Sequence, residues 1–386
     1  MKFKKAVIWV HLWLGLISGA IIVFLGITGC ILAFQREIED ATQSYRFVEE
    51  RQQEFLAPSI LQDVAVKTLP DKHLHAVLYE TKDKAAQAIF YQFEPNEHYY
   101  IVYLNPYTGQ VLKVKNMDTD FFRQVLLGHY YLWLPPEIGQ PIVAYATLVF
   151  VIMMISGLIL WWPRNKAARK QRFTIRFNAR WKRVNYDLHN VLGFYMTWLG
   201  IILALTGLVW GFQWFAKGLY SVSGGEKQLV YQEPLSDTTR IAQLSEPAID
   251  VVWKIMKAEH PGAKVLEVHP PESASSPIAA NVNPDPETYW QIDYRYFDQY
   301  NIKELPAESI YGRFNDAAVA DKIIRMNYDL HTGAIIGLPG KILMFFASLI
   351  AASLPVTGVY LWIGKKKKKK KTVTQLNSRA EPAVAM

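Results

Sequence analysis

The sequence predicts an α-helical membrane protein with four spanning helices, built from two parallel repeats, and two small external α+β domains. The first observation behind this prediction is hydropathy, because four stretches are long and almost free of charge. Each reaches or exceeds the roughly 20 residues that an α-helix needs to cross a hydrocarbon core. The four stretches are Ala6–Phe34, Pro141–Trp162, His189–Phe215 and Lys341–Ile363.

The second observation is a repeated spacing of histidine, glycine and threonine in the first and third stretches. In both, a histidine is followed by Gly, Thr and Gly at offsets of 4, 17 and 18 residues. Two copies with the same topology would be related by an axis along the membrane normal. The residues are His11, Gly15, Thr28 and Gly29 in the first copy and His189, Gly193, Thr206 and Gly207 in the second.

Positive charge lies beside the apolar stretches. The formal net charge is +8, and Pro163–Val184 carries nine Lys or Arg residues and no acidic residue. Seven consecutive lysines, Lys365–Lys371, follow the last stretch. Basic flanks of this kind mark the cytoplasmic side and contact anionic membrane lipid, so they do not indicate a nucleic-acid partner. We therefore expect both termini on the cytoplasmic side and the two long segments between the helices outside, which in a bacterial inner membrane would place two domains in the periplasm.

Each copy is expected to run as an outward helix, an external domain, a return segment and an inward helix. Proline separates the return segment from the inward helix, at Pro135-Pro136 and at Pro339, because proline cannot continue a helix. The expected parts are helix one (1–34), an external domain (35–120), a return segment with helix two (121–163), a basic loop (164–184), helix three (185–215), a second external domain (216–320), a return segment with helix four (321–364) and a lysine-rich tail (365–386).

The external segments mix strand and helix patterns. Runs of aromatic and β-branched residues predict strands, and Asn105-Pro106-Tyr107-Thr108-Gly109 has the composition of a turn between two of them. Asp298-Gln299-Tyr300-Asn301 holds the matching place in the second copy. The predicted strands are Ala88–Phe93, Tyr99–Leu104, Gln110–Leu112, Lys264–His269, Ala279–Val282 and Tyr289–Phe297, and a helix is predicted at Ile249–Glu259.

Four histidines fall one per membrane segment, at His11, His129, His189 and His331. Ionisable side chains at membrane depth are costly and tend to be functional. Parallel symmetry would pair His11 with His189 near the cytoplasmic side and His129 with His331 near the external side. Imidazole is a common haem ligand, and helix bundles hold cofactors between facing helices. The pattern therefore predicts two b-type haems, each with two histidine side chains as axial ligands to its iron.

Two other interpretations of these histidines stay open. They would be interfacial, hydrogen-bonding residues in a protein without haem, or they would bind a bare metal ion. Two imidazoles fall short of the three or four protein ligands that zinc usually takes. The glycines beside the histidines, Gly15, Gly193, Gly128 and Gly333, fit a flat macrocycle that lies against a helix. The external His73 and His75 would share one side of a strand, either as a metal site or as solvated surface residues.

The sequence contains no recognisable nucleotide-binding motif, neither Gly-x-Gly-x-x-Gly after a strand nor Gly-x-x-x-x-Gly-Lys-Ser/Thr. A haem protein of this kind would therefore take electrons from a separate donor, either a cytoplasmic molecule or a quinol. The electrons would cross the membrane and reduce an external acceptor, with the haems performing the redox chemistry.

Taken together, these features resemble the PepSY-associated transmembrane helix family over nearly the whole chain. The resemblance is carried by the repeated histidine and threonine–glycine spacings, by Tyr103–Leu112, by Leu330-His331-Thr332-Gly333 and by Thr357-Gly358. In this sequence Asn105 stands where an aspartate is commoner, and the second copy of the turn lacks the Thr-Gly pair. The resemblance implies that the external domains are PepSY-like.

Members of that family include bacterial inner-membrane iron-siderophore reductases with two b-type haems. The resemblance thus implies a membrane-bound ferric-siderophore reductase that takes ferric siderophore or another external acceptor. The alternative function is a PepSY membrane protein without haem that binds or regulates a peptidase or another partner.

Overall fold

The computed structural model describes residues 2–92, 97–163, 165, 169, 171–240 and 242–380, with side chains described for residues 3–364 of these. Parts of the predicted basic loop (164, 166–168 and 170), the end of one predicted strand at Phe93 and the lysine side chains of Lys365–Lys371 lie outside this description. The chain divides into two compact units. The helical unit comprises Met1–Ala33, Leu127–Phe212 and Leu338–Met386, and the sheet unit comprises Phe34–Leu126 and Gln213–Gly337.

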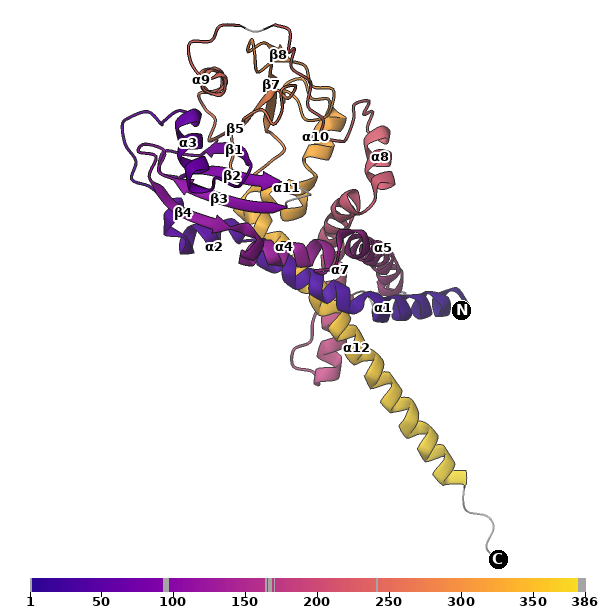
Figure 1. The fold of residues 1–386 in the computed structure, drawn as a ribbon. Coiled ribbons are helices and arrows are strands. Elements are labelled where there is room, and N and C mark those ends of the chain that lie inside the picture. The colour runs from indigo at the N-terminus through magenta and orange to yellow at the C-terminus, as the bar shows by residue number, and fades with distance from the viewer. Residues whose placement is uncertain are drawn as a thin grey trace, which may run out of the picture. The chain divides into compact units, whose positions relative to one another are not determined.

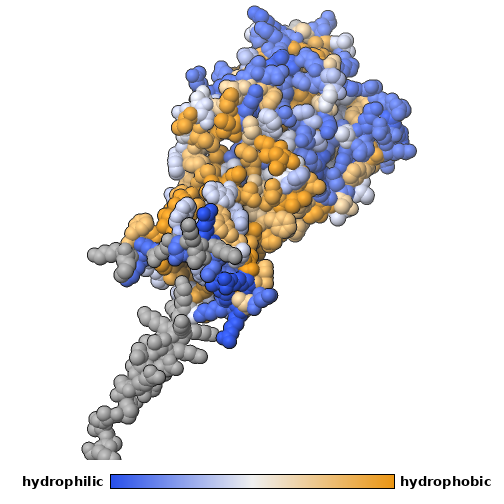
Figure 2. Space-filling model, turned by 180° about the vertical axis from the view of Figure 1, so that it is seen from behind, coloured by the Kyte–Doolittle hydropathy of each residue, from blue (hydrophilic) through white to orange (hydrophobic). Residues whose placement is uncertain are grey.

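Four helices of the described chain are long and apolar enough to cross a membrane, in agreement with the four predicted segments (Figure 1). Their spanning parts are 26 to 31 residues long. Hydrophobic side chains gather over these helices on the surface (Figure 2), and Ile155, Trp198 and Phe346 are among those exposed. The helices are α1 (Lys2–Leu32), α5 (Pro136–Trp161), α7 (Trp181–Gly211) and α12 (Leu338–Ala380).

All four helices begin earlier than the apolar stretches suggest, and the difference is largest for α7 and α5. α7 starts at Trp181, and α5 starts at Pro136 with Pro141 inside it. The segment before His189 contains no proline or glycine to stop a helix, so the helix continues into polar sequence. Apolar content marks the part of a helix that crosses hydrocarbon, and it does not mark the helix end. His189 therefore lies about two turns inside α7.

The four helices pack in a closed order in which α1 contacts α5 and α12, and α7 contacts the same two helices. α1 and α7, which carry the predicted ligands His11 and His189, are thus diagonal to each other. Small residues permit the close crossings. At Gly26 of α1, an added Cβ would lie 2.9 Å from the Cβ of Ala352 in α12, and at Gly211 of α7 it would lie 2.8 Å from the Cβ of Ala144 in α5.

The first return segment forms α4 (Phe121–Tyr131), which ends before the prolines. Leu132 and Trp133 follow with φ of 55° and 57°, the left-handed region that costs a non-glycine residue about 1–2 kcal/mol. The chain reverses so tightly that a Cβ added at Gly139, in the first turns of α5, would overlap the carbonyl oxygen of Tyr131. Only glycine fits at position 139 without moving this backbone.

Replacing Gly139 by alanine is therefore expected to destabilise the protein by at least about 1–3 kcal/mol, the usual cost of overpacking. The measurement is thermal unfolding of the detergent-solubilised protein followed by tryptophan fluorescence. Gly218→Ala is the matched control, because a Cβ there would meet no atom within 4 Å and alanine favours a helix. Equal melting temperatures for the two variants would contradict the claim that position 139 has no room for a Cβ atom.

The sheet unit holds one antiparallel sheet of eight strands in the order β4-β3-β2-β1-β5-β6-β7-β8 (Figure 1). The strands are β1 (Leu74–Tyr79), β2 (Ala86–Gln92), β3 (His98–Leu104), β4 (Val111–Asn116), β5 (Val265–His269), β6 (Ile278–Asn283), β7 (Asp293–Phe297) and β8 (Glu304–Leu305). Its remaining helices are α2 (Gln35–Thr42), α3 (Pro58–Thr68), α8 (Gln213–Val222), α9 (Ala248–Glu259), α10 (Val319–Arg325) and α11 (Asn327–Thr332).

The two external segments, expected as two small domains, share this one sheet. β1 pairs with β5 through Val77↔Val268 and its neighbours. Each of these strands would otherwise be the edge of a four-stranded half with a row of unpaired backbone groups. α3 and α9 cover the same face, and one hydrophobic core that includes Leu61, Val77, Val252 and Val268 runs beneath both. Pairing thus removes two edges and joins the two cores.

Six strands agree with predicted ones to within a few residues, whereas β1 was expected only as a strand around His73 and His75 and β8 was not predicted. β7 begins at Asp293, not at the predicted Tyr289. The reason is that the carboxylate of Asp329 accepts the backbone N–H groups of Tyr289 and Trp290, at 3.0 and 2.8 Å. Those groups are consequently not available to the sheet ladder.

The two predicted turns have the same hydrogen bonds. Asn105 Oδ1 accepts the N–H groups two and three residues later, at 2.9 and 3.3 Å. Asp298 Oδ1 does the same at 2.9 and 3.1 Å. Four residues after each, Gly109 has φ of 74° and Ile302 has φ of 61°. The second copy thus forms the turn without the Thr-Gly pair, and Ile302 takes up the strain that glycine avoids.

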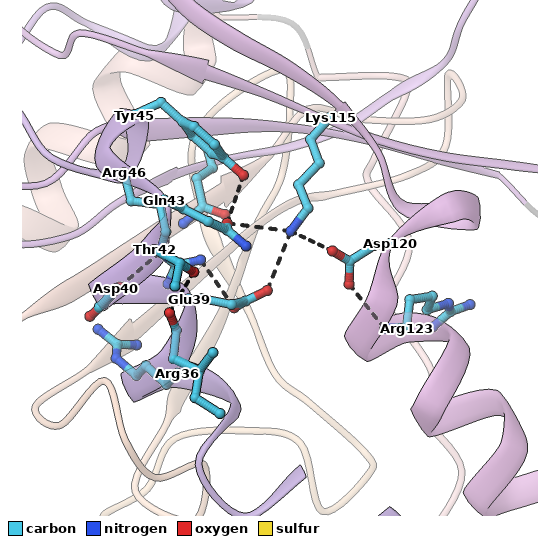
Figure 3. A network of polar contacts seen from close by, with 12 residues as sticks. Arg36, Glu39, Asp40, Thr42, Gln43, Tyr45, Arg46, Lys115, Asp120 and Arg123 are labelled. Atoms are coloured by element: carbon cyan, nitrogen blue, oxygen red, sulfur yellow. Dashed lines mark hydrogen bonds and ion pairs between the residues drawn. The ribbon is translucent and has the colours of Figure 1, made fainter. Parts of the chain in front are cut away.

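A buried polar network anchors α2 and the start of α4 to the sheet (Figure 3). Lys115 of β4 contacts Glu39 at 3.3 Å and Asp120 at 2.8 Å, and Arg46 contacts Glu39 at 3.2 Å and Asp40 at 2.8 Å. Burial opposes the ionisation of Asp40, but hydrogen bonds and charge from Lys84 and Arg46 outweigh it and lower its pKa. The network secures, within the sheet unit, two of the four segments that continue into the helical unit.

Candidate functional site

The helical unit contains an apolar cavity of about 470 Å³. This volume falls within the range of about 300–1,000 Å³ typical of ligand sites. His11 of α1 and His189 of α7 both line it, together with residues of α5 and α12. The two histidines that the sequence repeat paired therefore lie at one cavity, contributed by two diagonal helices.

Three of the predicted histidine rings are oriented by a hydroxyl group on another helix. His11 Nδ1 lies 2.8 Å from Ser156 Oγ of α5, and His189 Nδ1 lies 2.9 Å from Thr357 Oγ1 of α12. His129 Nδ1 lies 2.8 Å from Thr28 Oγ1 of α1. The same ring atom is held in the same way each time.

The hydroxyl contacts select the tautomer of these rings. Each hydroxyl also lies within hydrogen-bond distance of a carbonyl oxygen of its own helix, at 3.1 Å for Ser156, 2.9 Å for Thr357 and 2.9 Å for Thr28. A hydroxyl has one proton, which the carbonyl accepts, so its oxygen accepts the proton of the imidazole. Nδ1 then carries the ring proton and Nε2 carries the lone pair, which is the arrangement of a metal-ligating imidazole.

A glycine follows each of these hydroxyl residues and makes room for the ring. A Cβ added at Gly157 would lie 3.5 Å from His11 Cε1, and one at Gly358 would lie 3.4 Å from His189 Cε1. At Gly29 the distance to His129 Cε1 would be 3.7 Å. These are van der Waals distances, so each glycine lies directly beside the imidazole that the preceding hydroxyl group holds.

The sequence did not indicate that hydroxyl–glycine pairs contact the histidine rings of the candidate site. In the sequence, Thr28-Gly29 and Thr206-Gly207 served only as markers of the repeat, and Thr357-Gly358 served only as part of the family resemblance. The signal was present, because the dipeptide Ser/Thr-Gly occurs in all four spanning helices, once in α5, α7 and α12 and twice in α1, where Ser18-Gly19 precedes Thr28-Gly29. In α7 the pair Thr206-Gly207 stands at the same offset from His189 as Thr28-Gly29 does from His11.

The glycines predicted to face a macrocycle divide into two groups. Gly15 and Gly193 line the cavity. Gly128 instead packs against the ring of Trp133, which a Cβ there would approach to 2.8 Å. Gly333 has φ of 80° and ends α11 in the left-handed conformation. Close packing and backbone conformation therefore account for the latter two.

The motif Asn-Tyr-Asp-Leu-His occurs at 185–189 and at 327–331, and its aspartate has a structural role. Asp187 is buried, pairs with Arg183 at 2.9 Å and accepts the backbone N–H of Arg176 at 3.3 Å. Asp329 is also buried and accepts the two N–H groups in the turn before β7. At both occurrences of the motif, the aspartate two residues before the histidine fastens a loop to the histidine's helix.

The remaining predicted ligands lie in different units. His129 belongs to the helical unit and His331, in α11, to the sheet unit. The external His73 and His75 both approach the carboxylate of Glu272, at 3.7 and 3.4 Å, on a partly exposed surface. Among the described residues, no three His, Cys, Asp or Glu side chains gather as a site for a metal ion.

Residues 8–365 match the family described as the PepSY-associated TM region, a range that includes all four membrane histidines. The chain belongs to this family. No curated protein matches it. Membership in the PepSY-associated TM family and the four long apolar helices together establish a membrane protein.

Proposed function

We propose that the chain is a transmembrane electron-transfer protein that binds two b-type haems and reduces an acceptor on the external side. Ferric siderophore is the acceptor favoured by the resemblance to siderophore reductases. One observation carries the proposal, namely that His11 and His189 line one apolar cavity and that a hydroxyl group of another helix lies within hydrogen-bond distance of Nδ1 in each ring. Solvated or interfacial histidines do not require a hydroxyl group at the same ring nitrogen in each case.

The residues at this cavity fit a haem better than a bare metal ion. A haem brings four equatorial nitrogens, so the protein has to supply only two axial imidazoles. The apolar walls and the surfaces of Gly15 and Gly193 suit a flat macrocycle. Lys4 and Arg172 also line the cavity and offer positive charge to carboxylates. Arg172 is itself fixed, since its Nη1 donates to Asn190 Oδ1 at 2.9 Å.

A haem bound there would carry one electron at a time. The chain would hold its iron through Nε2 of His11 and His189, while Ser156 and Thr357 keep each ring in position. Such partners of a ligand raise its basicity and restrict its rotation. Apolar side chains from four helices would exclude water, which affects the reduction potential.

For the second haem we propose His129 and His331 as ligands. His129 has the same support as the inner pair, because Thr28 holds its Nδ1. The two-repeat organisation makes His331 its counterpart, and the matching turns at Asn105 and Asp298 support that organisation. Because basic segments beside spanning helices mark the cytoplasmic side, both termini would face the cytoplasm of a bacterium and the sheet unit would face the periplasm.

Mixing the reduced protein with an acceptor under anaerobic conditions tests the function. The haem-loaded protein is reduced with dithionite, freed of excess reductant and mixed with ferrioxamine B and the ferrous chelator ferrozine. Each ferric ion takes one electron, so reoxidation of the haem absorbance should match the formation of ferrous–ferrozine mole for mole. A reduced spectrum that persists for hours with ferrioxamine B present would reject this acceptor class.

Removing one hydroxyl should weaken the inner haem without removing a ligand. We expect Thr357→Val to release haem about 10–100-fold more readily, the usual effect of losing a partner of a metal ligand. Thr357→Ser keeps the hydroxyl and should behave as the unchanged protein. The dissociation constant is measured by titrating haem into the haem-free protein, and equal constants for valine and serine would contradict the role given to Thr357.

A further inference from the structure

The helix α8 follows the third spanning helix almost without a break. α7 ends at Gly211 and α8 begins at Gln213, so two residues of chain, which reach at most about 7 Å, connect them. α8 is ten residues long and belongs to the sheet unit. The proposed function does not use it. Its side chains begin close to the point where the chain leaves the membrane.

One side of α8 is apolar and exposed. An α-helix turns about 100° per residue, so residues four apart fall on the same side. Trp214, Gly218 and Val222 follow this spacing, and Phe215 and Leu219 lie beside them. Trp214 is 63% exposed, Leu219 37% and Val222 91%, and a Cβ added at Gly218 would meet no described atom within 4 Å. We call these five residues the apolar stripe of α8.

The opposite side of α8 is fixed to the sheet unit by Tyr220. This side chain is 4% exposed and packs with Ile310 and Ala320. Its hydroxyl group donates to Asp321 Oδ1 at 2.6 Å. At 100° per residue, Tyr220 lies about 160° around the helix from Val222. The helix is therefore held with its apolar stripe directed away from the residues that bind Tyr220.

This orientation is the reverse of the usual one. A surface helix normally directs its apolar side at the protein core and its polar side at water. A contiguous apolar surface left exposed marks a contact with lipid or with another protein. The apolar stripe of α8 therefore indicates a partner outside the described chain.

The first copy has an equivalent helix, α2, without such a stripe. α2 begins 24 residues after His11, and α8 begins 24 residues after His189. Six of the eight residues of α2 are polar, and Arg36, which holds the place of Trp214, pairs with Glu80 at 2.7 Å. The connection from a spanning helix to the sheet unit thus does not itself require an apolar stripe.

We propose that the apolar stripe of α8 inserts into the membrane surface at which α7 ends, and so anchors the sheet unit to lipid through its second copy. Two observations favour lipid over a protein partner. The stripe begins three residues beyond the last residue of the span, and it begins with Trp214, a residue type that concentrates at the level of the headgroups.

The length of α8 is sufficient for this role because α7 tethers it. A free helix of ten residues would bind a membrane weakly, but a tether makes the second contact intramolecular and raises its effective concentration. An amphipathic helix in the membrane surface buries its apolar side about 5–10 Å into the boundary between headgroups and acyl chains. This depth is the measurable consequence of the proposal.

The test places a fluorescent probe on α8 of the full-length protein, in lipid nanodiscs that hold one protein each. The single cysteine of the chain, Cys30, is replaced by serine, and a new one is introduced by Leu219→Cys or Val222→Cys. The environment-sensitive dye NBD is attached to it. Quenching is measured with iodide in the water and with phosphatidylcholine that carries a nitroxide near the headgroup end of an acyl chain.

We expect the dye at positions 219 and 222 to emit at shorter wavelength, to be quenched by the nitroxide lipid and to lose its quenching by iodide. Lys217→Cys is the control on the same helix, because residue 217 is exposed and lies outside the stripe. Ala41→Cys is the control on α2, where it is exposed and holds the place of Leu219. At both control positions iodide should quench the dye and the nitroxide lipid should quench it little.

Equal quenching by iodide at positions 219 and 217 would overturn the proposal. Protection from iodide without quenching by the nitroxide lipid would also overturn it, because protein and not lipid would then cover the stripe. Each variant is compared only if it melts at the temperature of the Cys30→Ser parent. The test uses no haem signal, so its result is independent of the proposed function.

Discussion

Replacing His11 or His189 by alanine will remove the inner haem and leave the outer haem in place. Each substitution deletes one of the two imidazoles that line the cavity of the helical unit. The other histidine alone cannot complete a six-coordinate haem, and the outer ligands His129 and His331 are untouched. A potentiometric titration of the purified protein should show two reduction steps without the substitution and one step with it.

A matched control for this result is His73→Ala. That histidine is partly exposed in the sheet unit and has no part in the proposed ligation. It should retain both reduction steps and the full haem content. If His11→Ala or His189→Ala left both haems bound with unaltered spectra, the pairing of these two residues would be wrong.

His129→Ala or His331→Ala will have the opposite effect and will also stop reduction of the external acceptor. The outer haem should be lost while the inner haem remains reducible by dithionite. Because the acceptor is expected on the external side, loss of the outer carrier should lower the rate of ferrioxamine B reduction by at least about 100-fold, which corresponds to roughly 2.7 kcal/mol in the barrier. The rate is followed as ferrous–ferrozine absorbance.

His260→Ala is the comparison for the outer pair, since it is another histidine of the sheet unit and lies 3.3 Å from Asp293. It should reduce ferrioxamine B at the normal rate. An outer-pair variant that lost its haem but kept that rate would show that the acceptor takes electrons elsewhere. A variant that kept both haems would remove His129 or His331 from the ligand set.

The four spanning helices were predictable because a hydrocarbon core demands long apolar runs, and such runs are plain in a sequence. The ends of the helices were harder to predict, because Trp181–Leu188 is polar and is nevertheless helical. The shared cavity of His11 and His189 followed from the repeat. The repeat alone did not show that α1 and α7 are diagonal.

The hydroxyl contacts of the histidine rings could not be predicted from hydropathy or from the repeat. Serine and threonine in helices commonly bond to a carbonyl of the preceding turn, and Ser156, Thr357 and Thr28 do so. The second partner of each hydroxyl comes from another helix, and only the packing of helices reveals it.

The joined sheet shows a similar limit. β1 and β5 are far apart in the chain, and no local pattern gives the pairing of Val77 with Val268. The turn at Asp298 was placed correctly by position, but a β-branched residue at positive φ is rare. The role of Ile302 as the counterpart of Gly109 therefore could not be anticipated.

The most direct test of the central claim is the haem content of the purified protein. The protein is expressed with haem supplied and purified in detergent, and its haem per chain is measured as the pyridine haemochrome beside a reduced-minus-oxidised spectrum. The account predicts b-type bands and two haems per chain. A colourless protein without haem would contradict it and would favour the alternative of a PepSY membrane protein that binds or regulates a partner.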